Sequence, residues 1–201
     1  VGFYDALTKT GASFGQVQTF NLDEYVGLPK AHPESYYTFM HQHLISRVDL
    51  DPRNCHIPDG MAADPDTECQ RYEALIREAG GLDVVVLGIG LNGHIGFNEP
   101  GSPWDARTRR VPLAEATRQA NARFFGSIDA MPREALTMGI GTILEAKQIL
   151  LLASGESKAE IIRRTLEGEP DIAVPATALQ RHPNVTFLLD TAAARVLQRT
   201  A

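Results

Sequence analysis

The sequence predicts an α/β protein with an open, mostly parallel, Rossmann-like sheet and helices on both of its faces. Three short apolar runs, at residues 82–87, 148–153 and 185–189, are typical of strands buried within a parallel sheet. Helical patterns separate these runs, and strands that alternate with helices indicate βαβ units. The 201 residues contain no repeat, low-complexity tract or linker, so we expect a single domain over residues 1–201.

The N-terminal part predicts a helix, a short strand and a second helix. The first helix covers residues 1–11 and ends at a glycine, the residue that most often closes a helix. A strand follows at residues 17–20. The second helix begins at Pro33 and Ser35 and reaches about Ser46, with its apolar residues on one face.

The remaining helices complete the alternating pattern. Asp64 and Pro65 are good N-cap and first-turn residues for a helix that ends at Gly80. Further helices are expected at residues 113–125, within 131–146 after a short extended piece, at 158–166, and after Asp190. These helices connect the apolar runs, as a parallel sheet requires.

Composition and charge argue against several classes of partner. The formal net charge is −6 and the sequence has no block of Lys and Arg, which argues against a surface for nucleic acid. No apolar run approaches the roughly 18 residues of a membrane span, and no signal peptide is recognisable. Cys55 and Cys69 have neither CxxC nor metal-ligand spacing. We therefore expect reduced thiols in a cytoplasmic protein.

Polar side chains follow the first apolar run. The loop after residues 82–87 contains Asn92, His94 and Glu99 among glycines, and open α/β sheets bind ligands at this end of their strands. The loop also has the dinucleotide-binding spacing G-x-G-x-x-G, but that motif requires a helix to begin at once. Two prolines and further glycines follow instead, which argues against a nicotinamide or flavin cofactor.

His94 is the first candidate for acid–base chemistry. An imidazole with an ordinary pKa of about 6.5 can take up and return a proton near neutral pH, and a carboxylate such as Glu99 can orient it. The alternative is a turn histidine that satisfies loop carbonyls. The residues alone leave both interpretations open.

Two further groups are weaker candidates. Asp23 and Glu24 follow the strand at residues 17–20, and neighbouring residues on an extended chain point in opposite directions, so only one can enter a site. The alternative interpretation is that both are acidic loop residues exposed to solvent. Residues 154–158 form a strand-to-helix turn that ends in Lys158, and such turns can bind phosphate through backbone N–H groups.

With these residues identified, the chain resembles the glucosamine-6-phosphate deaminase (glucosamine/galactosamine-6-phosphate isomerase) family. These enzymes convert glucosamine 6-phosphate and water into fructose 6-phosphate and ammonia. The resemblance covers nearly the whole chain and is carried by Phe20-Asn-Leu-Asp-Glu-Tyr-Val-Gly-Leu28, Gly93-His-Ile-Gly-Phe-Asn-Glu-Pro100, Ala120-Asn-Ala-Arg-Phe-Phe125, Gly139-Ile-Gly-Thr142 and Ser157-Lys158. The related 6-phosphogluconolactonases share the fold and a Gly-His step, but their loop does not continue into Phe-Asn-Glu-Pro.

The resemblance implies catalytic roles for four residues. Asp23 resembles the general base that moves a proton between C2 and C1 of the sugar. His94 resembles the group that opens the pyranose ring, and Asn92 and Glu99 resemble its supporting residues. These assignments agree with the chemistry, because ring opening needs a proton shuttle and isomerisation needs a carboxylate beside a carbon acid.

Arg123 and Lys158 resemble the side chains that hold the sugar phosphate, and fixed cations suit a dianionic phosphate. The implied partner is thus a small molecule, glucosamine 6-phosphate, and the resemblance is compatible with a homo-oligomer. Neither a metal nor an organic cofactor is implied. His41 and His43 diverge on their predicted helix and do not indicate a metal site.

Three features depart from the family pattern. Some members carry Asp at the position of Asn92, and Asn adds hydrogen bonds but no charge. Some allosteric members carry a Lys two residues after an Arg, whereas this chain has Arg109-Arg-Val111, which argues against activation by N-acetylglucosamine 6-phosphate. The family's first strand and its Ser/Thr/Gly phosphate loop belong before Val1, so we expect the 201 residues to lack both and to be nearly inactive alone.

Two other functions are considered beside an enzyme of amino-sugar catabolism. The first is a 6-phosphogluconolactonase-like hydrolase. The feature of this chain that discriminates against it is Phe97-Asn-Glu-Pro100 together with Asp23-Glu-Tyr25. A non-catalytic sugar-phosphate-binding module would have no use for Asp23, His94 and Glu99. All of these residues are present, which favours the deaminase.

Overall fold

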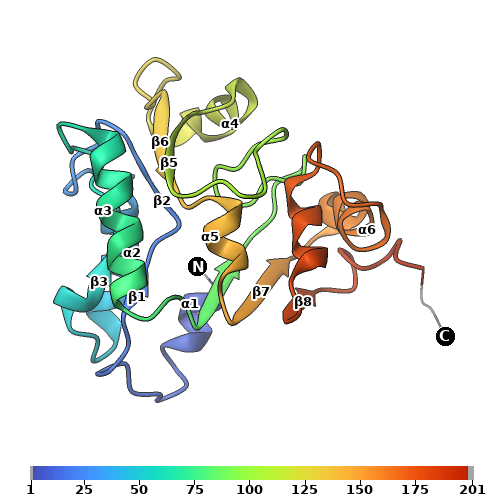
Figure 1. Ribbon diagram of the computed structural model, residues 1–201, viewed down its shortest axis with the longest axis horizontal. Helices are drawn as coiled ribbons and strands as arrows, with labels where there is room; N and C mark the ends of the chain where they lie inside the picture. Colours follow the sequence, from blue (N-terminus) through green and yellow to red (C-terminus); the bar gives the residue numbers. More distant parts are fainter. Residues whose placement is uncertain (1, 199–201) are drawn as a thin grey trace. The chain divides into compact units, whose positions relative to one another are not determined.

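The structure is a computed structural model that describes residues 2–198, and it confirms the predicted α/β class with parallel strands (Figure 1). The sequence suggested one sheet, whereas the described strands form three short ones. Their orders are β1 (Thr19–Phe20) with β3 (Cys55–His56); β2 (Asp23–Tyr25), β6 (Glu134–Thr137) and β5 (Arg109–Pro112); and β4 (Val84–Leu87), β7 (Gln148–Ala153) and β8 (Val185–Leu189). A bend at Leu22 separates β1 from β2, so the chain leaves the first sheet and enters the second within three residues.

The chain divides into two compact units, which are described separately. The first comprises the residues up to Tyr72 together with Arg110–Leu136, and the second comprises Glu73–Arg109 together with the residues from Thr137 onward. The described part of the chain has no helix that is both long and apolar enough to cross a membrane.

The first unit contains the short N-terminal elements. Its helices are α1 (Gly2–Leu7), α2 (Tyr36–His43), the first half of α3 (Pro65–Glu78), α4 (Glu115–Asn121), and the 3₁₀ turns η1 (Ile45–Arg47), η2 (Pro52–Asn54) and η3 (Ala122–Phe124). Ser35 caps α2, since its hydroxyl accepts a hydrogen bond from Thr38 N at 3.0 Å. The apolar core beneath α2 consists of Phe14, Met40, Leu44, Ile45, Leu50 and Ile57.

The predicted start of α3 is confirmed. Oδ1 of Asp64 accepts hydrogen bonds from Asp66 N and Thr67 N at 3.0 and 3.3 Å, as an N-cap residue does. Tyr72, which is fully buried on this helix, donates its hydroxyl to the carbonyls of Asn21 and His56. The contact holds α3 against β1 and β3.

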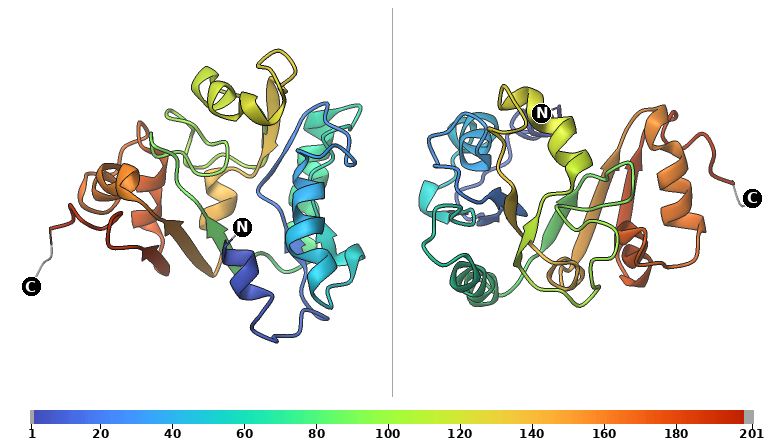
Figure 2. Two further views of the ribbon diagram at one scale, coloured as in Figure 1. Left: turned by 180° about the vertical axis from the view of Figure 1, so that it is seen from behind. Right: turned by 90° about the horizontal axis from the view of Figure 1, so that it is seen from above.

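The second unit is built on the parallel sheet β4–β7–β8, whose strands lie side by side in Figure 2. β7 and β8 have the predicted bounds. Its helices are α5 (Ile140–Leu144), α6 (Ala159–Glu167) and the 3₁₀ segments η4 (Glu156–Lys158) and η5 (Pro175–Arg181). Its deeply buried side chains include Ile143, Ile149, Leu151, Ile162 and Leu179.

Two predictions about this unit are wrong. β4 is not buried on both faces: Val85 and Leu87 are buried, but Val84 and Val86 are 48% and 37% exposed. Successive side chains of a strand point to opposite faces, and in the described part of the chain only one face of β4 is covered. No helix follows Asp190 within the described residues; its carboxylate accepts from Ala193 N, and residues 191–196 form turns.

Several predicted helices are shorter than expected. The helix predicted at residues 113–125 is α4 and a separate 3₁₀ turn, η3, and the helix predicted to reach Ser46 ends at His43. The first strand is confined to Thr19–Phe20, while Asp23–Tyr25 is itself a strand of the next sheet. The long apolar elements are therefore predicted better than the short ones.

Candidate active site

The loop after β4 is fastened to the second unit by buried hydrogen bonds. Asn98 is fully buried, and its side-chain amide donates to the carbonyls of Ile95 and Met138, at 2.9 Å each. The backbone N–H of Phe97 donates to Thr137 Oγ1 at 3.1 Å. This role of Asn98 was not predicted from the sequence, although Asn98 lies in the Phe-Asn-Glu-Pro segment. These bonds give the loop one conformation, which fixes the side chains that it carries.

Two glycines allow the loop to fold tightly. A Cβ atom on Gly90 would lie 2.2 Å from atoms of the His94 ring. Gly93 has φ +85°, and a Cβ there would lie 2.6 Å from Val174 Cγ1. No helix begins between Gly88 and Thr108, so the context that a dinucleotide site requires does not form.

His94, Asn92 and Glu99 form a hydrogen-bonded group. Asn92 Nδ2 donates to Glu99 Oε2 at 2.8 Å, and Asn92 Oδ1 lies 2.7 Å from His94 Nδ1. An ionised carboxylate can only accept, so the amide nitrogen of Asn92 faces Glu99 and its oxygen faces His94. Nδ1 of His94 must then carry the hydrogen, which leaves the lone pair on Nε2.

Burial favours the neutral form of the His94 ring. Its pKa is lowered mainly by burial, with a smaller lowering from Lys158, while the Glu99 carboxylate opposes both. Glu99 Oε2 lies 3.6 Å from Nδ1, and the amide of Asn92 forms a hydrogen bond with both groups. The side chain of His94 remains 29% exposed. A neutral, partly accessible imidazole with a free Nε2 can accept a proton from a ligand.

Lys158 lies at the same edge of the sheet as this group. β4 and β7 are parallel neighbours, and both the His94 loop and η4 follow their carboxyl ends. Lys158 Nζ donates to the carbonyl of Ile89 at 2.6 Å, and burial lowers the pKa of its ammonium group. In the preceding turn, Gly155 N–H donates to the Asp190 carboxylate at 2.9 Å. The Lys158 ammonium, rather than that N–H group, is thus the candidate anion-binding group of this turn.

Asp23 occupies a different environment, in the first unit. Its side chain is 9% exposed, and it forms no hydrogen bond or ion pair with any residue between 2 and 198. Burial, and then the neighbouring Glu24 carboxylate, raise the pKa of Asp23 to about 7. The tyrosines with which it interacts electrostatically are Tyr4, Tyr25, Tyr36 and Tyr72. A buried carboxyl group with such a pKa can act as a base near neutral pH.

Arg123 also belongs to the first unit. It lies in η3, is exposed, and its guanidinium carbon is 4.7 Å from the centre of the Phe124 ring. The six predicted site residues therefore fall into two groups. Asn92, His94, Glu99 and Lys158 are brought together in the second unit, and Asp23 and Arg123 belong to the first.

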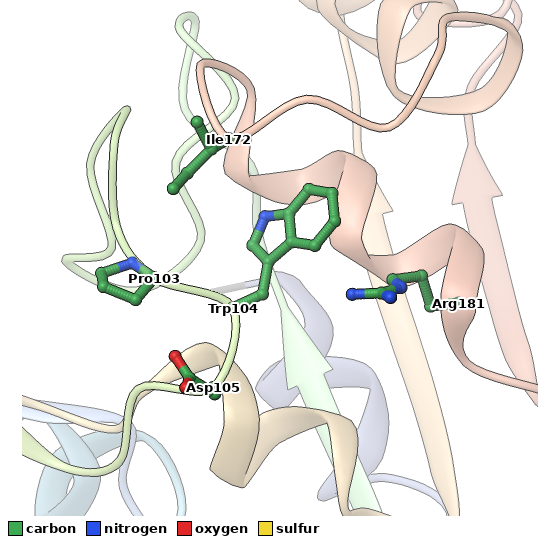
Figure 3. Close-up of a pocket in the computed structure, with 5 residues that line it drawn as sticks. All are labelled: Pro103, Trp104, Asp105, Ile172 and Arg181. Atoms are coloured by element: carbon green, nitrogen blue, oxygen red, sulfur yellow. The ribbon is translucent and has the colours of Figure 1, made fainter.

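A pocket of about 550 Å³ lies elsewhere in the second unit. Figure 3 shows its lining residues, Pro103, Trp104, Asp105, Ile172 and Arg181, and none of them is a predicted site residue. The Arg181 guanidinium carbon lies 4.9 Å from the centre of the Trp104 ring. Residues 2–198 contain no group of three or more His, Cys, Asp or Glu side chains arranged to hold a metal ion.

Comparison with known proteins identifies the class to which this fold and this loop belong. A family model described as glucosamine-6-phosphate isomerases/6-phosphogluconolactonase matches residues 2–188, so the chain is a member of that family. Among its relatives, the glucosamine-6-phosphate deaminase of Shouchella clausii is 51% identical over 193 residues, which are 96% of this chain and 78% of that protein.

Solved structures agree with this assignment. The structure of a monomeric glucosamine-6-phosphate deaminase matches with a TM-score of 0.94 and 49% identity, and covers 97% of this chain and 83% of that one. The 6-phosphogluconolactonase of Trypanosoma cruzi matches with a TM-score of 0.76 at 20% identity, over 98% of this chain and 80% of that one. At that identity the lactonase shares the fold alone.

Proposed function

We propose that this protein is an enzyme for the conversion of glucosamine 6-phosphate and water into fructose 6-phosphate and ammonia. The observation that carries the proposal is the hydrogen-bonded group in which Asn92 and Glu99 leave Nε2 of His94 free to exchange a proton. The family membership of the chain and its 51% identity to a glucosamine-6-phosphate deaminase support the same activity.

His94 opens the sugar ring. Nε2 accepts the proton of the anomeric hydroxyl and returns it to the ring oxygen as the bond between C1 and that oxygen breaks. Glu99 stabilises the transiently charged imidazolium through Asn92, and the lowered pKa of His94 favours return of the proton. The product of this step is the open-chain aldehyde.

Asp23 then carries out the isomerisation. Its carboxylate removes the proton from C2 of the open-chain sugar and delivers it to C1. In this isomerisation the C1 aldehyde is reduced while C2, which carries the nitrogen, is oxidised to an imine. The resulting imine at C2 takes up water and releases ammonia, leaving the ketone of fructose 6-phosphate. A carboxyl with a pKa of about 7 is a stronger base than an ordinary aspartate, which suits the abstraction of a weakly acidic C–H proton.

Lys158 and Arg123 bind the phosphate of the sugar. Each charge-assisted hydrogen bond contributes about 1.5–3 kcal/mol, so two cations would hold the substrate while its ring opens. The steps are proton transfers and hydrolysis of an imine, and the chemistry needs neither a metal nor an organic cofactor.

Two coupled assays with purified protein test this proposal. Ammonia and fructose 6-phosphate should form in equal amounts from glucosamine 6-phosphate, and fructose 6-phosphate should take up solvent deuterium at C1. Asp23→Asn should abolish both signals while sugar-phosphate binding remains. Hydrolysis of 6-phosphogluconolactone without ammonia release would favour the lactonase instead, and tight binding of sugar phosphate without turnover would favour a non-catalytic module.

The cellular setting is a further part of the proposal. Cys55 and Cys69 are free thiols in the structure, which suits a cytoplasmic enzyme of amino-sugar metabolism. We expect residues 1–201 to act as one sugar-phosphate isomerase/deaminase domain and to be compatible with a homo-oligomer, although the solved relative is described as monomeric. Cell fractionation and light scattering test the location and the assembly state.

A further inference from the structure

Glu24, the residue after the proposed base, makes contacts that its sequence position did not predict. It is 3% exposed, and its carboxylate points to the N-terminus of α2. Oε1 accepts hydrogen bonds from Tyr25 N at 2.9 Å and Tyr36 N at 3.2 Å, and Oε2 accepts one from Tyr37 N at 3.2 Å. Glu24 is therefore a second cap of this helix, beside Ser35.

The two caps divide the backbone donors of α2 between them. Tyr36 and Tyr37 supply the first two N–H groups of the helix and donate to Glu24, while Thr38 N donates to Ser35 Oγ. These are groups that a helix cannot satisfy internally. Burial raises the pKa of Glu24, while the hydrogen bonds from the Tyr25, Tyr36 and Tyr37 N–H groups oppose this rise and favour the carboxylate form. The N-terminal end of a helix favours a negative charge as well.

This arrangement separates the roles of the two adjacent acids. The side chains of neighbouring strand residues point in opposite directions, and Glu24 is committed to α2. Asp23 is left on the other side of β2 with no hydrogen-bond partner among residues 2–198. The ring of Tyr25 stacks on that of Tyr36 at 5.5 Å between centroids, which gives β2 a second contact with α2.

We propose that Glu24 is a positioning residue for the isomerisation: it fastens the strand that carries Asp23 to the N-terminus of α2 and holds a fixed negative charge beside the Asp23 carboxyl group. The proposal rests on the proposed role of Asp23 as the base. It adds that the strength of this base depends on a neighbour that does not touch the substrate.

The other groups around Asp23 do not provide this charge. The other titratable side chains that interact with it are Tyr25 of the same strand and, from three further elements, Tyr4 of α1, Tyr36 of α2 and Tyr72 of α3. Burial raises the pKa of each of these tyrosines, so they stay neutral over the working pH range. After burial, the neighbouring Glu24 carboxylate is the group that raises the pKa of Asp23.

The test compares Glu24→Gln with a matched control, Glu34→Gln, which removes a charge near the same helix end that does not contribute to the shifted pKa of Asp23. Glu24→Gln should lower the pH at which Asp23 titrates, followed by carbon-13 NMR, by on the order of one unit. The acidic limb of the turnover profile should move by the same amount, and turnover at pH 8 should fall about tenfold at unchanged KM. Glu34→Gln should change neither.

The proposal would be overturned if Asp23 titrated at the same pH in the folded Glu24→Gln variant as in the unmodified protein. If this variant does not fold, Glu24→Asp is used instead, because it keeps the charge on a shorter side chain. Turnover equal to that of the unmodified enzyme would then overturn the positioning role. If Asp23→Asn retained turnover, Asp23 would not be the base, and the proposed function of this residue would fail. The NMR titration of Asp23 does not depend on enzyme activity, so it tests the effect of Glu24 separately. The two failures are therefore distinguishable.

Discussion

Nδ1 of His94 lies 2.7 Å from Oδ1 of Asn92, and this contact decides which ring nitrogen exchanges protons. Because Asn92 also donates to Glu99, its amide cannot rotate without placing two donors or two acceptors against each other. The amide therefore transmits the orientation of a carboxylate to the imidazole without a second charge. Relatives that carry Asp at this position would place that charge directly beside the ring.

Asn92→Asp should raise the pKa of His94 by on the order of one unit, because a carboxylate next to Nδ1 stabilises the imidazolium. Nitrogen-15 NMR titration of the ring measures this value. Asn92→Ala is the control, since it removes the acceptor without adding a charge and should not raise the pKa. A lowered pKa in Asn92→Asp would contradict the contact described above.

His94→Gln should leave the fold intact and lower turnover of the closed-ring substrate by about 10²- to 10⁴-fold, as loss of a general acid–base commonly does. Steady-state kinetics and thermal unfolding measure the two effects separately. The partly exposed position of His94 supports the expectation that stability is little affected. An unchanged rate would assign the loop a structural role only.

Asp23 makes the stability of the fold depend on pH. Its pKa of about 7 in the folded protein lies above the ordinary value of 3.8, so the folded state binds this proton more tightly than the unfolded chain. The stabilisation is complete below about pH 4 and is lost as the pH rises through about 7. Asp23→Asn should therefore raise the free energy of unfolding at pH 8 by on the order of 1–4 kcal/mol and change it little at pH 4.

Urea unfolding at both pH values measures this difference. Stabilisation of equal size at pH 4 and pH 8 would show that the uncharged side chain acts through packing rather than through the proton.

Gly90→Ala should displace the His94 ring, since the added Cβ would lie 2.2 Å from it. We expect turnover to fall at least tenfold and the free energy of unfolding to fall by about 1–3 kcal/mol, the usual cost of overpacking. Gly88→Ala is the matched control in the same loop, because a Cβ there meets nothing within 4 Å. Equal effects of the two substitutions would argue against a specific contact between Gly90 and His94.

Local patterns in the sequence predicted the regular parts of this protein well. β7 and β8 follow from short apolar runs and the start of α3 from the Asp64 cap, and both signals depend on neighbouring residues. The Glu24 cap could not be predicted in this way, because its partners lie 12 and 13 positions away in the sequence. The same holds for Asn98, whose amide bonds to Met138.

The sequence predicted which residues form the candidate site better than it predicted their arrangement. The glycine-rich loop and the family resemblance indicated His94, Asn92 and Glu99, but their spacing allowed a direct contact between His94 and Glu99. In the structure the Asn92 amide forms a hydrogen bond with each of them, while Glu99 Oε2 itself lies 3.6 Å from His94 Nδ1. The exposure of Val84 and Val86 was missed for a related reason, since an unbroken apolar run does not reveal which of its faces is covered.

The face of the β4–β7–β8 sheet that residues 2–198 leave uncovered also affects how the chain behaves during purification. Val84, Val86 and Leu188 present apolar side chains to water there, and such surfaces attract one another more strongly on warming and in sulfate. Purification is then best done cold and at low concentrations of salting-out ions. Chromatography on a phenyl matrix would retain the chain more tightly than its net charge of −6 suggests.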